Sequence, residues 1–205
     1  SGGRPAIVRN EGFQRSRGRY IHFLDDDDRL APGALQALVG ALDNNKQAGM
    51  AFGWVVPFGD DPMVLKNKTE WFSRAADIAR SAITRYQIVS TILFKGALLV
   101  NSACMIRRGC FEALGGYDPT IMYYQDVDLW MRSIRRYGYV FVDQPILQYR
   151  TGADSRIHNL HENWKPVEDS YAIIHRKYRA EHGLFEYAML QFYSRFLPSV
   201  TPASR

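Results

Sequence analysis

A run of four aspartates, residues 25–28, is the first feature of the 205-residue chain with the residue types for chemistry. It directly follows the apolar segment 20–24, which is typical of a buried strand. Four adjacent carboxylates repel one another, and a hard divalent cation such as Mg²⁺ or Mn²⁺ relieves that repulsion. Because alternate positions of an extended turn point the same way, Asp25 and Asp27 are predicted to face one metal ion. The alternative is a solvated turn in which an aspartate caps the next helix, and we expect that cap for Asp28.

A second acidic site lies at Asp126 and Asp128, where a helix carrying Trp130 is predicted to begin. Residues two apart on a helix point to nearly opposite sides, so only one of the two carboxylates is expected to face a given pocket. A carboxylate held near a hydroxyl can serve as a general base. The alternative is a helix N-cap, with Arg132 pairing with Asp128 at the surface. Trp130 itself is expected in the helix core.

Strands that alternate with helices are predicted around these two sites, which indicates an α/β layer structure. The acidic turn leads into an amphipathic helix with Leu35, Leu38 and Leu42 on one face, ending near residues 44–45. Further strands are predicted at 48–58, 98–106, 139–142 and 146–149, and further helices at about 69–87, 111–114, 125–138, 168–182 and 184–196. No strand is predicted ahead of the basic N-terminal segment.

The composition is that of an ordinary globular domain. The chain has 26 Lys and Arg against 21 Asp and Glu, a net charge of +5, and 46% hydrophobic and 23% charged residues. These proportions exclude a disordered chain, a collagen and a coiled coil. The longest apolar stretch, residues 92–100, contains Lys95 and is far shorter than the ~20 residues that cross a bilayer. The N-terminus does not resemble a signal peptide, and two cysteines, Cys104 and Cys110, are too few for a disulfide framework. A cytoplasmic location is therefore expected.

Basic residues concentrate at the start of the chain, where five arginines face one acid, Glu11. Such a cluster suits the phosphates of a nucleotide or of a nucleic acid, and it is also typical of a solvated surface. On charge alone we favour the surface. Nucleic acid is not expected as a partner, because no aromatic strand typical of an RNA-binding module accompanies the arginines. The five are Arg4, Arg9, Arg15, Arg17 and Arg19.

Three blocks of sequence, taken in order, resemble the family 2 glycosyltransferases, an inverting group built on the GT-A fold. The first runs from Arg9-Asn10-Glu11-Gly12 to the aspartate run, which contains the family's DxD element. The second joins Leu114-Gly115-Gly116-Tyr117-Asp118 to Gln125-Asp126-Val127-Asp128-Leu129-Trp130, and the third is Pro145-Ile146-Leu147-Gln148-Tyr149-Arg150. The resemblance implies a GT-A-like α/β fold, a mixed sheet with helices on both faces. It also implies a catalytic core over residues 1–160 and a C-terminal helical extension over residues 161–205.

The resemblance gives each matched residue an implied role. Asp25 and Asp27 would handle the ribose and a Mn²⁺ or Mg²⁺ ion on a nucleotide-diphosphate sugar, and Asp126 would deprotonate the acceptor hydroxyl. Gly116 would let the substrate approach the backbone, or would simply form a turn. The implied acceptor is a saccharide or a lipid-linked molecule, and the missing Gln-x-x-Arg-Trp element favours a single transfer over polymerisation. Diphosphate or nucleotide contacts are implied for three further residues, each with an alternative structural role: Arg9, Asn10 and Arg150.

The chain departs from the family pattern at three places. Gln125 stands where the family usually has Glu. Thr151-Gly152 replaces a histidine that would be a third metal ligand, a role for which His158 and His161 are candidates. The family's first apolar strand has no counterpart ahead of Arg9, so we expect an N-terminally truncated fold with an exposed sheet edge. Weak turnover is then expected of this polypeptide alone, unless a second copy, as in a homodimer, or another chain covers that edge.

Two other functions stay open on the sequence. One is a non-catalytic module that binds a nucleotide or a sugar and keeps the acidic turn. The other is a two-metal phosphohydrolase or nuclease, which would need more clustered acids and histidines than the chain offers. The aromatic and basic C-terminal helices are expected to pack on the sheet. Their alternative role is peripheral docking on a membrane that carries a lipid-linked acceptor.

Overall fold

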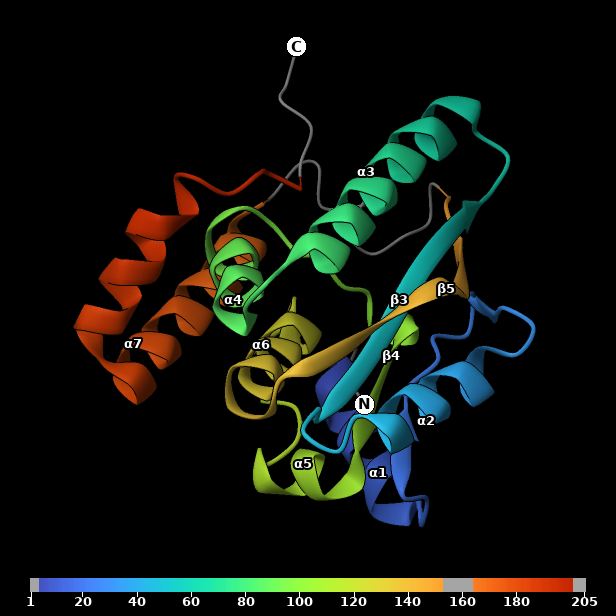
Figure 1. Ribbon diagram of the computed structural model, residues 1–205, viewed down its shortest axis with the longest axis horizontal. Coiled ribbons are helices and arrows are strands. Elements are labelled where there is room, and N and C mark those ends of the chain that lie inside the picture. Colours follow the sequence, from blue (N-terminus) through green and yellow to red (C-terminus); the bar gives the residue numbers. More distant parts are fainter. Residues whose placement is uncertain (1–3, 153–163, 201–205) are drawn as a thin grey trace.

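The computed structural model of the protein describes residues 4–152 and 164–200, which form one mixed sheet flanked by helices (Figure 1). The strands are β1 (Tyr20–His22), β2 (Arg29–Leu30), β3 (Met50–Phe58), β4 (Cys104–Arg107) and β5 (Tyr139–Arg150). The helices are α1 (Pro5–Arg15), α2 (Ala34–Asn44), α3 (Pro62–Ser81), α4 (Arg85–Phe94), α5 (Arg108–Ala113), α6 (Gln125–Tyr137) and α7 (Lys165–Ser194), with a short 3₁₀ helix, η1 (Asn101–Ala103).

The sheet brings the ends of three strands to one edge. Its strand order is β1-β4-β3-β5-β2, and β3 pairs with β5 in parallel. Strand β4 is antiparallel to both β1 and β3, so β1, β3 and β5 all run in the same direction. Their carboxyl ends therefore lie at the same edge. The acidic run that follows β1 and the last residues of β5 meet there, as expected for a ligand site of an α/β fold.

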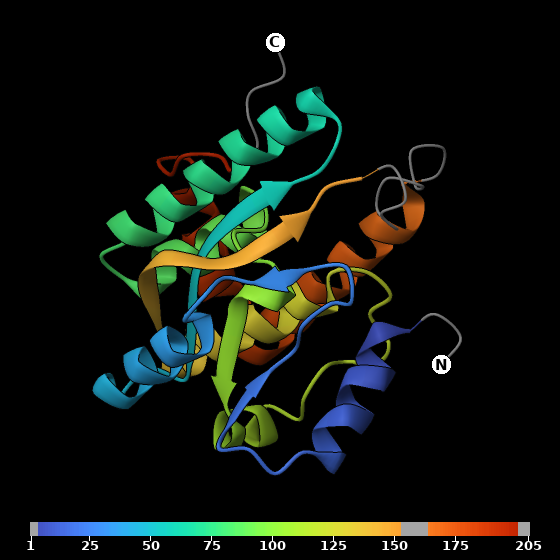
Figure 2. The ribbon, with the colours of Figure 1, turned by 90° about the vertical axis from the view of Figure 1, so that its right-hand side faces the viewer.

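Helices cover both faces of the sheet, as predicted (Figure 2). Side chains alternate along β3, so Ala51 packs with Leu38 and Leu42 of α2 in one buried cluster. Met50 and Phe52 belong to the larger cluster on the other face, which α3, α4 and α6 supply. The helix predicted from the leucine spacing is confirmed as α2, and Leu38 and Leu42 are fully buried, whereas Leu35 is exposed.

Strand β5 is continuous where two strands were predicted. Its pairing with β3 shifts between Gly53 and Val55, so that Gly53 lies opposite Val142 and Trp54 opposite Pro145. Val55 then lies opposite Leu147, so β5 has three extra residues over this stretch, which bulge from the pairing beside Gly53 and Trp54. A Cβ atom on Gly53 would lie 2.4 Å from Ile146 and 2.7 Å from the Val142 carbonyl oxygen, so only glycine allows this approach.

The helical stretch predicted at 69–87 is in fact two helices. Helix α3 ends at Ser81, and a capping box begins α4: the Gln87 N–H donates to the Thr84 hydroxyl, and the Thr84 N–H donates to Gln87 Oε1 at 2.9 Å. The strand predicted at 98–106 is shorter than expected, because η1 precedes β4. The basic N-terminal segment, to which no element was assigned, forms helix α1.

Helix α7 has a kink at Gly183 (φ 84°, ψ 159°), between the two helical segments predicted for this region. The C-terminal helix packs mainly against α4, and not against the sheet as predicted. Ile174, Tyr178 and Leu190 join the main core. The predicted boundary between residues 160 and 161 lies outside the described residues. Within the described part of the chain, no helix is both long enough and apolar enough to cross a bilayer.

A polar contact joins α6 to α7 beside this core. Arg135 donates two hydrogen bonds to the Glu186 carboxylate, each 2.7 Å long, and the Tyr178 hydroxyl donates a third at 2.6 Å. The hydrogen bonds from Arg135 are the largest cause that lowers the pKa of Glu186, to about 2. The carboxylate is therefore more stable in the folded chain than in the unfolded chain.

Replacing Glu186 with Gln is expected to lower the free energy of unfolding at pH 7 by about 2 kcal/mol, because charge-assisted hydrogen bonds to Arg135 are lost. Since the folded-state pKa of Glu186 lies below its unfolded value, this stability is present above pH 4.5 and is lost as the pH falls toward 2. Urea denaturation of the unmodified chain and of Glu186→Gln between pH 7 and pH 2 measures this difference in the free energy of unfolding. Glu112→Gln, in an exposed pair, is the control. A difference that does not change with pH would contradict the assignment.

Candidate active site

The first carboxylate of the acidic run is fixed by two polar contacts. Asp25 lies three residues beyond the end of β1, and its backbone N–H donates to Ser102 Oγ at 3.0 Å. Its half-buried carboxylate accepts a hydrogen bond from Arg9 Nη2 at 2.6 Å. Strand β1 and η1 thus set the backbone of Asp25, and helix α1 sets its side chain.

The rest of the acidic run divides between solvent and core. Asp27 is exposed, whereas Asp28 is buried. The helix cap predicted for Asp28 is wrong, because α2 begins after Gly33 with no side-chain cap. Asp28 instead accepts a hydrogen bond from the backbone N–H of Arg150 at 3.1 Å, which joins the run to the end of β5. Burial is the main cause that raises the pKa of Asp28 to about 6.

Helix α6 presents Asp126 from its first turn. The residue before the helix, Tyr124, has a left-handed backbone (φ 58°), a conformation that bulky residues rarely adopt. Asp126 Oδ1 accepts a hydrogen bond from the Val127 N–H at 3.0 Å. Burial raises the pKa of Asp126, Arg9 opposes that rise, and the nearby Asp25 adds to it. A carboxylate with a raised pKa is a stronger proton acceptor than one in water.

Asp128 points to the other side of the helix, as the helical spacing predicted. It is fully buried rather than at the surface, and contacts Arg132 Nη2 at 2.7 Å and Lys177 Nζ at 3.0 Å. Arg132 also donates to the carbonyl oxygens of Leu114 and Gly116. Asp128 is therefore structural, and Trp130 is fully buried in the core, as predicted.

Arg9 lies between the two candidate carboxylates. Its burial lowers the pKa, but the charges of Asp25 and Asp126 outweigh that effect, so the pKa of Arg9 is raised. Its Nη1 atom is buried and has no hydrogen-bond partner among the described residues. A buried donor without a partner is costly, and a ligand oxygen would supply one.

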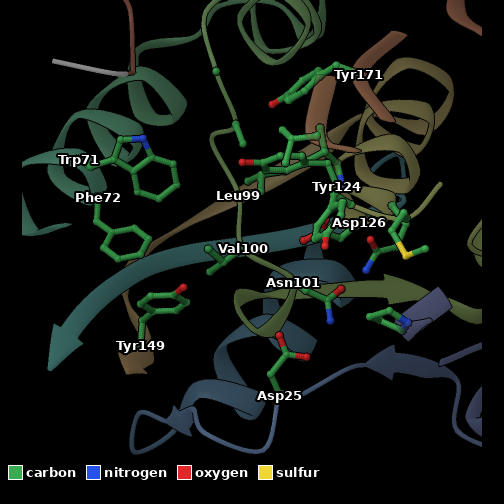
Figure 3. Close-up of a pocket in the computed structure, with 18 of the residues that line it drawn as sticks. Asp25, Trp71, Phe72, Leu99, Val100, Asn101, Tyr124, Asp126, Tyr149 and Tyr171 are labelled. Carbon is green, nitrogen blue, oxygen red and sulfur yellow. The ribbon is translucent and has the colours of Figure 1, made fainter. Parts of the chain in front are cut away.

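Asp25, Arg9 and Asp126 line one cavity of about 1050 Å³. Figure 3 shows the two carboxylates facing this hollow, with Trp71, Phe72 and Tyr149 on the side away from Asp126. The sequence had predicted the acids but not the aromatic residues, which come from elements far apart in the chain. Further lining residues missed by the motifs are Lys68, Asn101, Tyr124 and Tyr171.

The structure does not bring the other predicted contact residues to this cavity. Asn10 donates to the Tyr117 carbonyl oxygen at 2.8 Å and accepts from its N–H at 3.0 Å, so both ends of the amide serve the turn. Gly116 lines a separate hollow of about 450 Å³. Arg150 is exposed, with its guanidinium 5.5 Å from the centre of the Phe58 ring.

No group of three or more His, Cys, Asp and Glu side chains suited to a metal occurs among residues 4–152 and 164–200. The carboxylates predicted to bind a metal, Asp25 and Asp27, therefore belong to no larger His, Cys, Asp and Glu cluster in that part of the chain. His158 and His161, the candidates for such a ligand, lie outside the described residues. The metal site stays a prediction.

Comparison with known proteins decides the family. Residues 4–177 match the family model described as "Glycosyltransferase like family 2". The chain belongs to this family. Two curated relatives of the glycosyltransferase are an uncharacterized glycosyltransferase, MJ1057, of Methanocaldococcus jannaschii and an uncharacterized protein, MT1568, of Mycobacterium tuberculosis. The first is 27% identical over 69% of this chain and 45% of the relative, and the second is 29% identical over 65% and 42%.

Solved structures confirm the predicted fold class of this glycosyltransferase. The crystal structure of Staphylococcus aureus TarS, residues 1–349, superposes with a TM-score of 0.62 at 10% identity, covering 96% of this chain and 52% of TarS. Its complex with UDP-GlcNAc gives a TM-score of 0.64 at 11% identity, covering 96% and 54%. The fold is thus GT-A. The chain spans about half the length of the relatives it matches.

Alanine at Gly116 tests whether this residue shapes the turn. Gly115 and Gly116 both have φ of +73°, which costs a non-glycine residue about 1 kcal/mol. A Cβ on Gly116 would also lie 2.7 Å from Asn10 Oδ1, whereas one on Gly115 would meet nothing within 4 Å. Gly116→Ala is therefore expected to lower the free energy of unfolding more than Gly115→Ala, as measured by urea denaturation. Equal losses would show that the Asn10 contact is unimportant.

Proposed function

We propose that this chain transfers a sugar from a nucleotide-diphosphate sugar to an acceptor hydroxyl, with inversion at the anomeric carbon. The observation that carries the proposal is the meeting of Asp25, Arg9 and Asp126 at one cavity. The TarS complex with UDP-GlcNAc supports a donor of this class. Because the chain spans about half of that relative, activity of the whole protein is part of the same proposal.

Asp126 is the proposed base. In an inverting displacement, the acceptor oxygen forms a bond to the anomeric carbon as the bond from that carbon to the phosphate oxygen breaks. The hydroxyl proton passes to the base, and the diphosphate leaves with the electron pair. Burial and the raised pKa of Asp126 support this role, because they strengthen its affinity for the proton. A lowered pKa would have weakened it.

Arg9 is the proposed contact for the leaving diphosphate. Its Nη2 atom holds Asp25, and its buried Nη1 atom lacks a partner in the described part of the chain. A guanidinium makes strong, directed hydrogen bonds to phosphate oxygens. One side chain would then fix the acidic run and face the charge that develops on the diphosphate.

Asp25 and Asp27 are the proposed ligands of Mn²⁺ or Mg²⁺. Carboxylates are the hard oxygen ligands that these ions prefer, and Mg²⁺ commonly binds one or two of them together with substrate phosphates. Two carboxylates would leave the other coordination positions of the ion to the donor phosphates. Asp25 lines the cavity, whereas Asp27 is exposed and is not among the lining residues. When bound, the ion would stabilise charge on the leaving diphosphate. A two-metal phosphohydrolase gains no support, because the described residues hold no larger acidic cluster.

Nucleoside diphosphates screened with and without Mn²⁺ by thermal shift test the donor site. One of them is expected to raise Tm more with the ion than without it, since a ligand that binds only the folded state stabilises by mass action. Asp25→Asn is expected to remove the cation-dependent part. The matched control is Asp26→Asn, at an exposed neighbour in the same run. A shift that is unchanged in Asp25→Asn would rule out Asp25 as a ligand.

Replacing Asp126 with Asn tests catalysis separately from binding. The variant is expected to reduce nucleotide release in the presence of saccharide acceptors by about 10²-fold or more, because no other base is proposed. Its thermal shift with nucleoside diphosphate should be kept. The control is Glu168→Gln, an exposed residue at the rim of the same cavity. Binding without turnover in the unmodified chain would instead favour a non-catalytic nucleotide-binding module.

A further inference from the structure

One side of the cavity is an aromatic wall that the proposed donor chemistry does not use. Trp71 and Phe72 of α3 have ring centroids 4.7 Å apart, and Phe72 lies 5.4 Å from Tyr149 of β5, edge to face in both cases. Across the hollow, Tyr124 and Tyr171 form a second pair at 4.9 Å (Figure 3). Both groups line the same cavity, and Leu99 and Val100 lie between them (Figure 3).

Lys68 adds a cation to this wall. It lies one turn before Trp71 on α3 and lines the same cavity, and its ammonium is 5.7 Å from the centre of the Trp71 ring. No carboxylate pairs with it among the described residues, and burial lowers its pKa. A half-buried cation without an anionic partner is less stable than one in water. A negative group on a bound ligand would supply the partner.

The other charged side chains at the cavity either pair with one another or lie at its exposed rim. Arg9 is paired with Asp25 and lies close to Asp126. Glu168 is exposed at the rim, and it contributes nothing to the pKa of Lys68. Lys68 is thus the cation on the aromatic side, separate from the Arg9 group that faces the proposed diphosphate.

We propose that the aromatic side of the cavity binds the acceptor, and that this acceptor is a saccharide carrying an anionic group next to the ring that packs on Trp71. The inference rests on the proposed function. The apolar face of a sugar ring packs on an aromatic ring, and polar groups at its edge fix its orientation. Lys68 would contact the anion through a charge-assisted hydrogen bond. The anion is a phosphate or a carboxylate, which share this chemistry.

Equilibrium titration with three small sugars tests the subsite without any turnover. The probes are glucose 6-phosphate, glucuronate and glucose. Binding is followed by the fluorescence of Trp71 and Trp164, which both line the cavity. At least one anionic sugar is expected to bind roughly tenfold more tightly than glucose, as one charge-assisted contact predicts. The anion that binds more tightly identifies phosphate or carboxylate as the source.

Three variants separate the contributions of the subsite. Lys68→Gln is expected to reduce the affinity for the anionic sugars to that for glucose and to leave glucose unchanged. Lys66→Gln, at an exposed position on the same helix, is the matched control and should change none of the three. Trp71→Phe should keep the preference for an anion while removing part of the fluorescence response.

Two results would overturn the proposal. One is equal or absent binding of the three sugars by the unmodified chain. The other is a loss of nucleoside diphosphate binding in Lys68→Gln with sugar binding intact, which would place Lys68 in the donor site. The proposed function fails in a different way, when no nucleoside diphosphate stabilises the chain. The sugar titrations remain readable in that case, so the two failures are distinguishable.

Discussion

The buried carboxylate of Asp128 holds together the segments on which the candidate active site depends. Arg132 and Lys177 both contact it, so α6 is tied to α7 and, through the carbonyl oxygens that Arg132 also binds, to the turn at Gly116. Leaving a buried charge without its partners is far more costly than breaking a surface pair. The first turn of α6 therefore has little freedom to shift. Asp126 lies on the opposite side of that turn and lines the cavity. Asp128 therefore helps to position Asp126 although Asp128 itself does not line the cavity.

Local patterns predicted most of the elements and missed the features that depend on distant residues. Residues close together in the chain determine helix α2, through its leucine spacing, and the end of α6 at Gly138. Both predictions are confirmed. The break between α3 and α4 also has a local signal, the capping box of Thr84 and Gln87, but the single helix predicted at 69–87 did not take it into account. The continuity of β5 is different, because it requires Gly53 of another strand to accept a bulge. No local pattern of β5 carries that information.

The candidate site divides in the same way. Asp25 and Asp126 were predicted from separate motifs, and the fold brings them to one cavity. The cap predicted for Asp28 is wrong because a backbone N–H far along the chain competes for its carboxylate. Lys68, Trp71 and Phe72 belong to no motif, and Tyr149 was part of the third block but was given no role. Their significance arises from the burial of a cation among rings of α3 and β5, which only the packing of the two elements produces.

The kink at Gly183 separates two segments of α7, and both of them contribute side chains to the interior. Before it, Lys177 and Tyr178 reach inward to Asp128 and Glu186. After it, Glu186 and Leu190 also face inward, whereas Phe185, Phe192 and Phe196 lie on the outer surface, where they are 55–82% exposed. Mutations on the outer stripe therefore leave the inner contacts undisturbed. The second segment of α7 can therefore change its exposed surface at these positions while its inward-facing side chains keep the helix on the core.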